Sequence, residues 1–201
     1  MKKSAVSKKI TLSIFAIVFP CFIFCQPAKK GSLQYLSFCN GFKPIELGSE
    51  VERLDQGKLA YLDDVDSLDS DGCYKFCYKD SAMLYLGHGL LLNRVGLRTY
   101  NNRIVNIYLF FPRNAGHEVL QNFEANYGEC TGVLGEFMYD WKTTGVTLSL
   151  RYSRAIEMGV AIFTCVDLEN QVIEDGNKRK TKQQDNQGLP VTATAAASKP
   201  E

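Results

Sequence analysis

Residues 95–128 decide the fold, and they read VGLRTYNNRIVNIYLFFPRNAGHEVLQNFEANYG. Residues 104–111 are β-branched or aromatic at most positions, which predicts a strand. Its more apolar face is expected to carry every second residue, namely Val105, Ile107, Leu109 and Phe111. Residues 94–99 also alternate between apolar and polar side chains, so a second strand is expected before this one.

Asn101 and Asn102 predict the turn of a hairpin between the two strands, because asparagine tolerates the left-handed backbone conformation. A two-residue turn would place apolar residues opposite polar ones. A three-residue loop over residues 101–103 places Leu97 opposite Ile107 and keeps the apolar residues together. We therefore expect the longer loop.

A helix is expected directly after the hairpin. Asn114 is a suitable N-cap, and Gly128 stands where a glycine commonly ends a helix. The apolar residues between them recur at helical spacing: Val119, Leu120, Phe123 and Tyr127. This apolar stripe must be buried against the sheet, since neither element can shield its apolar face alone.

The rest of the chain repeats these element types. Ser49 and Glu52 form a capping box, which predicts a short helix that ends at Gly57, and residues 33–36 could begin a strand before it. Further strands are expected over residues 136–141, 146–151 and 160–165. The predicted fold class is α+β, a curved antiparallel sheet with two helices packed on one face. The order of elements also fits a tandem α-β-β-β pseudo-repeat.

The composition divides the chain into three segments. Residues 1–25 have a lysine-rich start and an apolar run of about 16 residues, which is short for a membrane span and typical of a signal peptide. Cleavage near Cys25, Gln26 or Ala28 is expected, and an uncleaved anchor is the alternative. Residues 29–170 form one α+β domain. Residues 171–201 are polar and basic, which predicts a disordered tail.

The charge of the chain argues against nucleic acid as a partner. Its formal charge is +1, and loss of the four lysines among the first nine residues leaves −3. A body of this charge has no general affinity for phosphate backbones. Contact with a membrane is expected only through the signal segment, if that segment stays uncleaved.

The segment from Ile45 to Val51 reads IELGSEV and resembles the entry into the first helix of two families of exported bacterial domains. They are the small outer-membrane lipoprotein (SmpA/OmlA) family and the β-lactamase-inhibitor-protein family. The predicted order of helix, antiparallel strands, helix and antiparallel strands is similar to the tandem form of that fold, with Tyr139-Asp140-Trp141 opening the late strands. The resemblance covers residues 42–167 and implies a sheet face or loops that bind another protein. The chain departs from it by lacking a lipobox and by adding strands around residues 84–92.

Cysteine chemistry supports a second hypothesis. Cys73 and Cys77, with His88 between Gly87 and Gly89, could form part of a small thiol-dependent or hydrolytic enzyme. Disulfide or structural roles for the cysteines, and a simple turn at His88, are the alternative. Between zero and two disulfides are expected, and the spacing does not determine their pairing.

A cluster of acidic residues raises a third hypothesis. Asp66, Asp69 and Asp71 could bind a cation such as calcium, although the spacing fails two of the four acidic positions of an EF-hand loop. A solvated loop is the alternative. The sequence has no phosphate-binding loop, nucleophile elbow, zinc-protease helix or dinucleotide fingerprint, and no cofactor is expected.

We therefore expect a non-enzymatic protein-binding module in the periplasm or outside the cell, of an inhibitor, immunity or envelope-assembly accessory type. Arg94, Arg98 and Tyr100 line one side of the hairpin and are candidates for a protein-binding face. Trp141 is a candidate interface anchor, because tryptophan is enriched at binding hot spots. A solvated strand face and a buried tryptophan are the respective alternatives.

Overall fold

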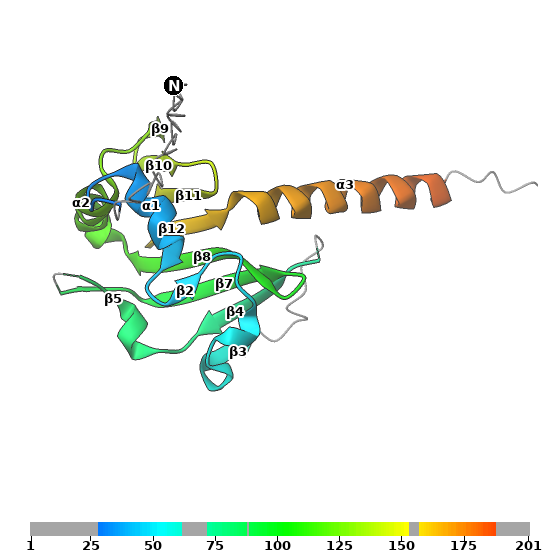
Figure 1. The fold of residues 1–201 in the computed structure, drawn as a ribbon, viewed down its shortest axis with the longest axis horizontal. Coiled ribbons are helices and arrows are strands. Elements are labelled where there is room, and N and C mark those ends of the chain that lie inside the picture. Colours follow the sequence, from blue (N-terminus) through cyan, green and yellow to red (C-terminus); the bar gives the residue numbers. More distant parts are fainter. Residues whose placement is uncertain (1–27, 62–71, 88, 153–156, 188–201) are drawn as a thin grey trace, which may run out of the picture.

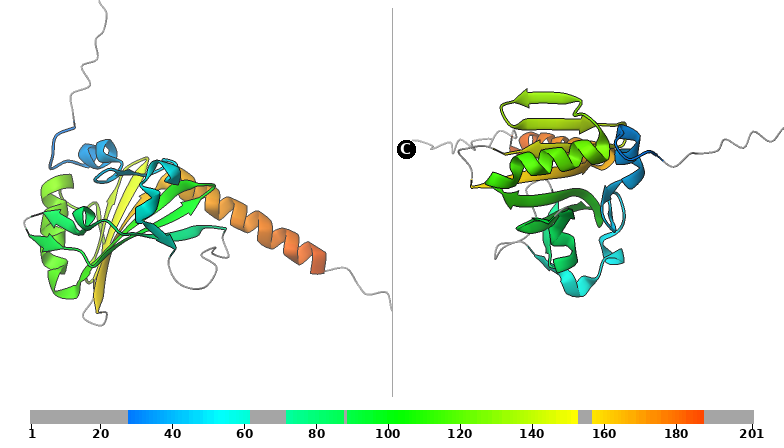
Figure 2. Two further views of the ribbon diagram at one scale, coloured as in Figure 1. Left: turned by 90° about the horizontal axis from the view of Figure 1, so that it is seen from below. Right: turned by 90° about the vertical axis from the view of Figure 1, so that its left-hand side faces the viewer.

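The computed structural model describes residues 28–61, 72–87, 89–152 and 157–187 (Figure 1). One antiparallel sheet of eight strands dominates them. Its strands lie in the order β3 (Leu59–Tyr61), β4 (Tyr74–Tyr78), β7 (Arg94–Tyr100), β8 (Arg103–Pro112), β12 (Met158–Cys165), β11 (Val146–Arg151), β10 (Met138–Lys142) and β9 (Gly132–Gly135). The predicted α+β class with an antiparallel sheet is confirmed, and Figure 2 shows the sheet twisted and open.

The strand order divides the sheet into two halves. Helix α1 (Leu33–Cys39) precedes strands β3, β4, β7 and β8, and helix α2 (Gly116–Tyr127) precedes strands β9 to β12. The last strand of each half lies at the centre, where β8 and β12 pair antiparallel with Ile107 opposite Phe163. This order fits a tandem arrangement, with four strands in each half where the α-β-β-β pattern predicted three. Two small hairpins are inserted in the first half: β1 (Gly41–Phe42) with β2 (Ile45–Glu46), and β5 (Tyr85–Gly87) with β6 (Leu90–Leu91).

Helices α1 and α2 cover one face of the sheet, which we call the inner face (Figures 1 and 2). The centre of this core is Phe123 of α2, whose ring meets those of Trp141 and Phe163 edge-on at centroid distances of 5.9 and 6.1 Å. Leu36 of α1 is fully buried in the same cluster. The prediction of two helices on one face is confirmed.

The central hairpin has the predicted pairing of Leu97 with Ile107 but not the predicted loop. Its turn has two residues, Asn101 and Asn102, both left-handed with φ of 46° and 63°, as twisted hairpins prefer. A β-bulge in β8 supplies the extra residue, because the partner of β7 shifts from Asn106 to Ile104. The three-residue loop is therefore wrong, although the argument from the apolar faces chose the right register.

The bulge reverses the alternation of β8 at its start. Ile104 belongs to the inner cluster, whereas Val105 packs in a second cluster on the opposite face of the sheet. The prediction that Val105 shares a face with Ile107 is therefore wrong. One extra residue in a strand moves every side chain before it to the other face of the sheet. The bulge therefore places Val105 on the outer face, where it forms part of a second apolar cluster.

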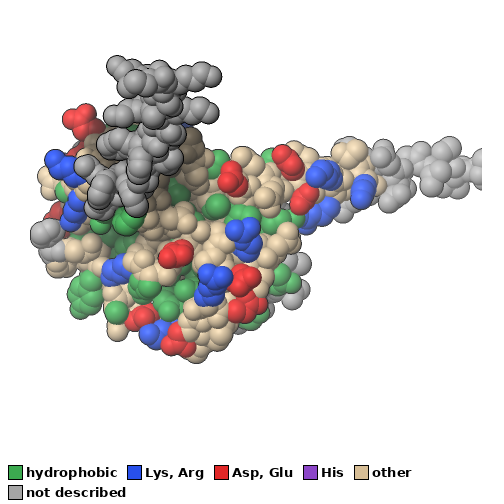
Figure 3. Space-filling model, in the orientation of Figure 1, with side chains coloured by type: hydrophobic (Ala, Val, Ile, Leu, Met, Phe, Trp, Pro, Cys, Tyr) green, Lys and Arg blue, Asp and Glu red, His purple; other side chains and the backbone are tan. Residues whose placement is uncertain are grey.

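A third helix, α3 (Val166–Gln187), follows β12 directly and contributes to that cluster (Figure 1). Leu168 and Val172, one helical turn apart, are buried against Tyr100 and Val105. The remainder of the helix projects from the sheet, and charged side chains lie on it as far as Lys182 (Figure 3).

The disordered tail expected from residue 171 is wrong in its boundary, since the helix continues to Gln187. Two features favour a helix here. Asp167 and Glu169 lie in its first turn, where acidic groups interact favourably with the helix dipole. The following glutamine, lysine and arginine residues are good helix formers. Residues 188–201 lie outside the described part of the chain.

The helix expected over residues 49–57 is also wrong. That segment forms two 3-10 turns, Val51–Arg53 and Gln56–Lys58, and the Ser49 hydroxyl donates to the Glu46 carbonyl at 2.7 Å. The first helix is instead α1, where a strand seemed possible from the sequence. Its Leu36 is buried and its end is set by Asn40 in the left-handed conformation. Burial of Leu36 against the core decided the local structure.

Helix α2 ends as predicted and begins later than predicted. Gly128 has a φ of 82°, and its N–H donates to the Glu124 carbonyl at 2.8 Å. Asn114 does not cap the helix; it lies in the 3-10 turn Arg113–Ala115, and α2 begins at Gly116. A Cβ atom at Gly116 would lie 2.5 Å from the Tyr152 ring, so the approach of helix to sheet requires glycine there.

Candidate protein-interaction surface

The strand register places side chains of the outer face, opposite α1 and α2, in rows that cross the sheet. The row nearest the central turn contains Arg98, Asn106 and Thr164. Asn106 donates to the Thr164 hydroxyl at 3.0 Å, and Arg98 Nη1 donates to Asn106 Oδ1 at 2.9 Å. Arg98 Nη1 also meets both carboxylate oxygens of Glu169 on α3, at 2.8 and 3.1 Å. This row is thus a buried polar contact that docks α3.

A second polar contact fixes α3 six residues further along, nearly two helical turns from Glu169. The Tyr100 hydroxyl donates to Asp175 Oδ2 at 2.8 Å. This hydrogen bond, followed by burial, raises the pKa of Tyr100. The same bond, followed by one from Lys178, lowers the pKa of Asp175. The helix is therefore held by ionisable contacts at Glu169 and Asp175 as well as by the buried side chains of Leu168 and Val172.

The next two rows lie beyond the contact with α3 and form what we call the open sheet face. Its six residues are Gly96, Tyr108 and Ile162 in one row, and Arg94, Phe110 and Val160 in the other. All except the buried Gly96 are half-buried. Half-buried apolar residues in the middle of a sheet, rather than at its rim, are typical of surfaces that bind another protein.

Gly96 makes a hollow in this surface. A cavity of 250 Å³ opens there, lined by Lys75, Gly96, Leu97, Tyr108 and Phe110. A Cβ atom at Gly96 would lie 3.4 Å from the Phe110 ring, so any side chain at this position would fill part of the hollow. The cavity has room for one large side chain of a partner.

Tyr108 and Phe110 form an aromatic platform beside the hollow. Their rings lie nearly parallel, with centroids 6.2 Å apart and an interplanar angle of 15°. The Arg94 guanidinium covers the Phe110 ring at 4.4 Å from its centroid. Arg151 is exposed and follows Val160 in the same row as Phe110, where it adds a second positive charge. A large, rigid apolar area bordered by arginine is the composition of a binding hot spot.

The four residues proposed from the sequence as a protein-binding surface do not lie together on an open face. Arg94 belongs to the open sheet face. Arg98 and Tyr100 are buried beneath α3, with 8% and 7% of their surface exposed. Trp141 is fully buried in the inner core, and its Nε1 donates to the Gly128 carbonyl at 2.8 Å. The interpretation of Trp141 as an interface anchor is therefore wrong in this structure, and the alternative of a core tryptophan holds.

Sequence reasoning missed most of the open sheet face because both faces of β8 and β12 are apolar. Alternation placed Tyr108 on the less apolar side of its strand, which is correct. Val160 and Ile162, however, look like core residues, whereas Ala161 and Phe163 between them are the ones that face the inner core. Which of two apolar faces of a strand is buried depends on the elements that pack against it. The alternation of residues within one strand does not reveal those elements.

The thiol enzyme hypothesis gains no support from the described residues. Cys73 is buried in the cluster beneath α3, and Cys77 is half-buried opposite Gly96. His88 lies outside the described residues, but its neighbour Gly87 lies against Asn122 of α2, on the inner side of the sheet. The described cysteines Cys39, Cys77, Cys130 and Cys165 form no disulfide.

The proposed cation site falls on Asp66, Asp69 and Asp71, which lie outside the described residues. Within the described ranges, no group of three or more histidine, cysteine, aspartate or glutamate side chains is arranged to hold a metal ion.

Compared with family models, with curated proteins and with solved structures, the chain gives no match. The resemblance to exported lipoprotein and β-lactamase-inhibitor domains therefore stays a prediction. Among the described helices, none combines the length and the hydropathy needed to cross a membrane.

Proposed function

We propose that this chain is an exported, non-enzymatic protein-binding module that engages another protein through its open sheet face. The observation that carries the proposal is the aromatic platform of Tyr108 and Phe110, which stands beside the hollow at Gly96 and beneath Arg94. Such a surface offers a partner both a large apolar contact and a pocket for one anchoring side chain. An inhibitor, an immunity protein or an envelope-assembly accessory would each use it in this way.

We test this surface by capturing a partner from envelope extract with the wild-type protein and with matched variants. The purified protein should retain a stoichiometric partner, identified by mass spectrometry. Phe110→Ala and Gly96→Leu should abolish its retention, the first by removing half of the platform and the second by filling the hollow. Phe38→Ala is the matched control, because Phe38 is equally aromatic, is 66% exposed and lies on α1, away from the open sheet face.

The variants also define the result that would overturn the proposal. A partner retained equally by the wild type, Phe110→Ala and Gly96→Leu binds elsewhere, and the open sheet face then has no role in binding. Far-ultraviolet circular dichroism of each variant confirms that a lost partner reflects a changed surface and not an unfolded chain.

Export is tested separately. The lysine-rich start and short apolar run predict that the secreted or periplasmic protein begins between Cys25 and Lys29. N-terminal sequencing of the protein recovered from the envelope fraction measures this directly. A chain that still begins at Met1 would contradict cleavage and support the uncleaved anchor.

A further inference from the structure

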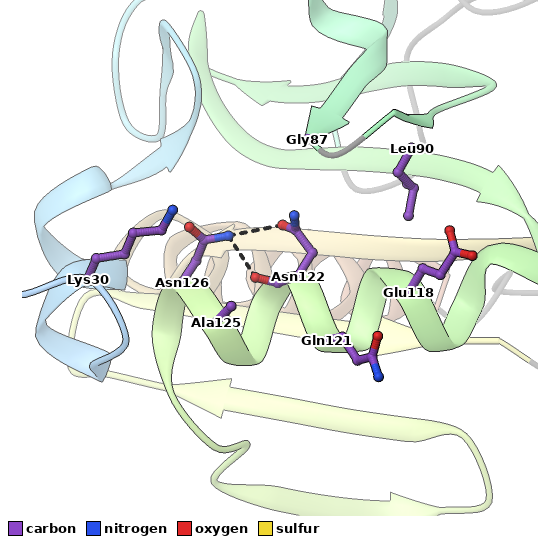
Figure 4. Close-up of a pocket in the computed structure, with 8 residues that line it drawn as sticks. All are labelled: Lys30, Gly87, Leu90, Glu118, Gln121, Asn122, Ala125 and Asn126. Carbon is purple, nitrogen blue, oxygen red and sulfur yellow. Dashed lines mark hydrogen bonds between the residues drawn. The ribbon is translucent and has the colours of Figure 1, made fainter.

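A second cavity lies on the inner side of the molecule, away from the open sheet face. Its volume is 360 Å³, and it is bounded by α2, by the hairpin β5–β6 and by the segment that leads into α1 (Figure 4). Its lining residues are Lys30, Gly87, Leu90, Glu118, Gln121, Asn122, Ala125 and Asn126. Most of the polar groups among these described residues come from one side of α2.

Two asparagines form the middle of this cleft. The Asn126 side-chain nitrogen donates to the Asn122 backbone carbonyl at 2.7 Å and to Asn122 Oδ1 at 3.0 Å (Figure 4). Because a backbone carbonyl only accepts, these bonds fix the orientation of both amides. They leave Asn122 Nδ2 as a donor and Asn126 Oδ1 as an acceptor. One donor beside one acceptor matches the C=O and N–H groups of a peptide backbone.

Opposite charges stand at the two ends of the cleft. Glu118, Asn122 and Asn126 follow each other at intervals of one helical turn, so about 12 Å of helix separates the first from the last. Lys30 lies at the Asn126 end and Glu118 at the other end (Figure 4). The N–H of Gly31 donates to the Asn126 carbonyl at 2.7 Å, which holds the Lys30 segment against the end of α2.

We propose that this cleft binds a short extended peptide with free termini. The ammonium of the peptide lies at Glu118, its carboxylate lies at Lys30, and the amide pair of Asn122 and Asn126 binds the backbone between them. Three extended residues span about 10 Å, which is close to the roughly 12 Å of helix that runs from Glu118 to Asn126 along the cleft. A single amino acid is too short to reach both charges.

The proposal is independent of the open sheet face, since α2 lies on the inner side of the sheet. It is tested on the purified protein by nuclear magnetic resonance titration with trialanine. We expect saturable shifts of the side-chain amide resonances of Asn122 and Asn126. N-acetyl-trialanine amide lacks both terminal charges and should bind about tenfold more weakly. Equal affinity for the two peptides, or no saturable shift of these resonances, would overturn the proposal.

Charge substitutions assign the two ends of the peptide. Lys30→Ala and Glu118→Gln should each weaken trialanine binding about three- to fivefold, as expected for exposed ion pairs. The matched controls are Lys29→Ala and Glu129→Gln, which alter exposed charges that do not line the cleft. These controls should leave the affinity unchanged. An equal loss with the controls would show attraction by overall charge and would contradict a defined site.

The direction of binding gives a further readout. Lys30→Ala should abolish the preference for a free peptide carboxylate, so trialanine and its C-terminal amide should then bind equally. The same variant should keep its preference for a free amino terminus. A variant that loses both preferences together would contradict the assignment of Lys30 to the carboxylate end.

Discussion

The two faces of the sheet are packed in different ways. The inner face is covered by α1 and α2 through apolar side chains, with Phe123 and Trp141 fully or almost fully buried. The outer face is held to α3 through a small apolar cluster and through the ion pair of Arg98 with Glu169, and its remaining part stays half-buried. Apolar burial is non-directional and stabilises the fold, whereas a half-buried face remains able to bind. The largest buried apolar core therefore lies on one side of the sheet, and the surface that we propose for protein binding lies on the other.

The largest effect is expected on the inner face. Trp141→Ala removes a fully buried ring and its hydrogen bond to the Gly128 carbonyl, and should lower the free energy of unfolding by ~3–5 kcal/mol. Urea denaturation measures this difference. Trp141→Phe keeps most of the packing and should cost clearly less. A loss of unfolding free energy for Trp141→Ala as small as that of a surface substitution would contradict the burial of Trp141 in the inner core.

The ion pair on the outer face should have the next largest effect. Arg98→Met removes the partner of Glu169 and of Asn106 beneath α3 and should cost ~1–3 kcal/mol of unfolding free energy, since Glu169 keeps access to water. The double variant Arg98→Met/Glu169→Leu should recover part of this loss. Purely additive losses in this cycle would show that the two side chains do not interact.

Tyr100→Phe should have a smaller effect that depends on pH. Loss of the hydrogen bond to Asp175 should lower the melting temperature by about 2–4 °C near neutral pH. The lowered pKa of Asp175 means that its contribution is present above about pH 4 and is lost as pH falls through that lowered pKa. The raised pKa of Tyr100 means that its contribution is present below about pH 10 and is lost as pH rises.

The difference in melting temperature between the wild type and Tyr100→Phe should therefore be constant from about pH 5 to pH 9 and shrink on either side. Thermal melts across this range measure it. Asp55 accepts the Gly57 N–H at 3.0 Å in the 3-10 turn Gln56–Lys58, whereas Tyr100 donates to Asp175, so Asp55→Asn is the control for general acid effects. A difference that does not vary with pH would contradict the contact between Tyr100 and Asp175.

The smallest effect on stability is expected at the open sheet face. Arg94→Ala removes only the contact of a half-buried guanidinium with the Phe110 ring and should cost ~0.5 kcal/mol of unfolding free energy. Its effect on partner binding should be larger, because arginine beside an aromatic ring is common at hot spots. Parallel urea denaturation and partner capture separate the two effects. A large loss of stability with unchanged binding would reverse the roles assigned to the two faces.

Much of the architecture could be predicted because it depends on local patterns. Alternation in β7 and β8, the asparagine turn and the glycine after α2 led to the right pairing of Leu97 with Ile107 and to a helix on the sheet. The candidate surface could not be predicted to the same extent. Arg98 and Tyr100 have the pattern of an exposed strand face, and only the return of α3 from a distant part of the chain buries them.

The sequence by itself determined the α+β class, the antiparallel central hairpin and the amphipathic helix that follows it, since each depends on spacing within one segment. The tertiary structure decided which apolar face of β12 is the core, where the bulge at Val105 lies, and that Leu168 and Val172 of α3 pack against the outer face. Each of these depends on contacts between segments far apart in the chain. The free energy of such contacts comes from surfaces that meet only in the folded protein, and it outweighs the local preferences of any one segment.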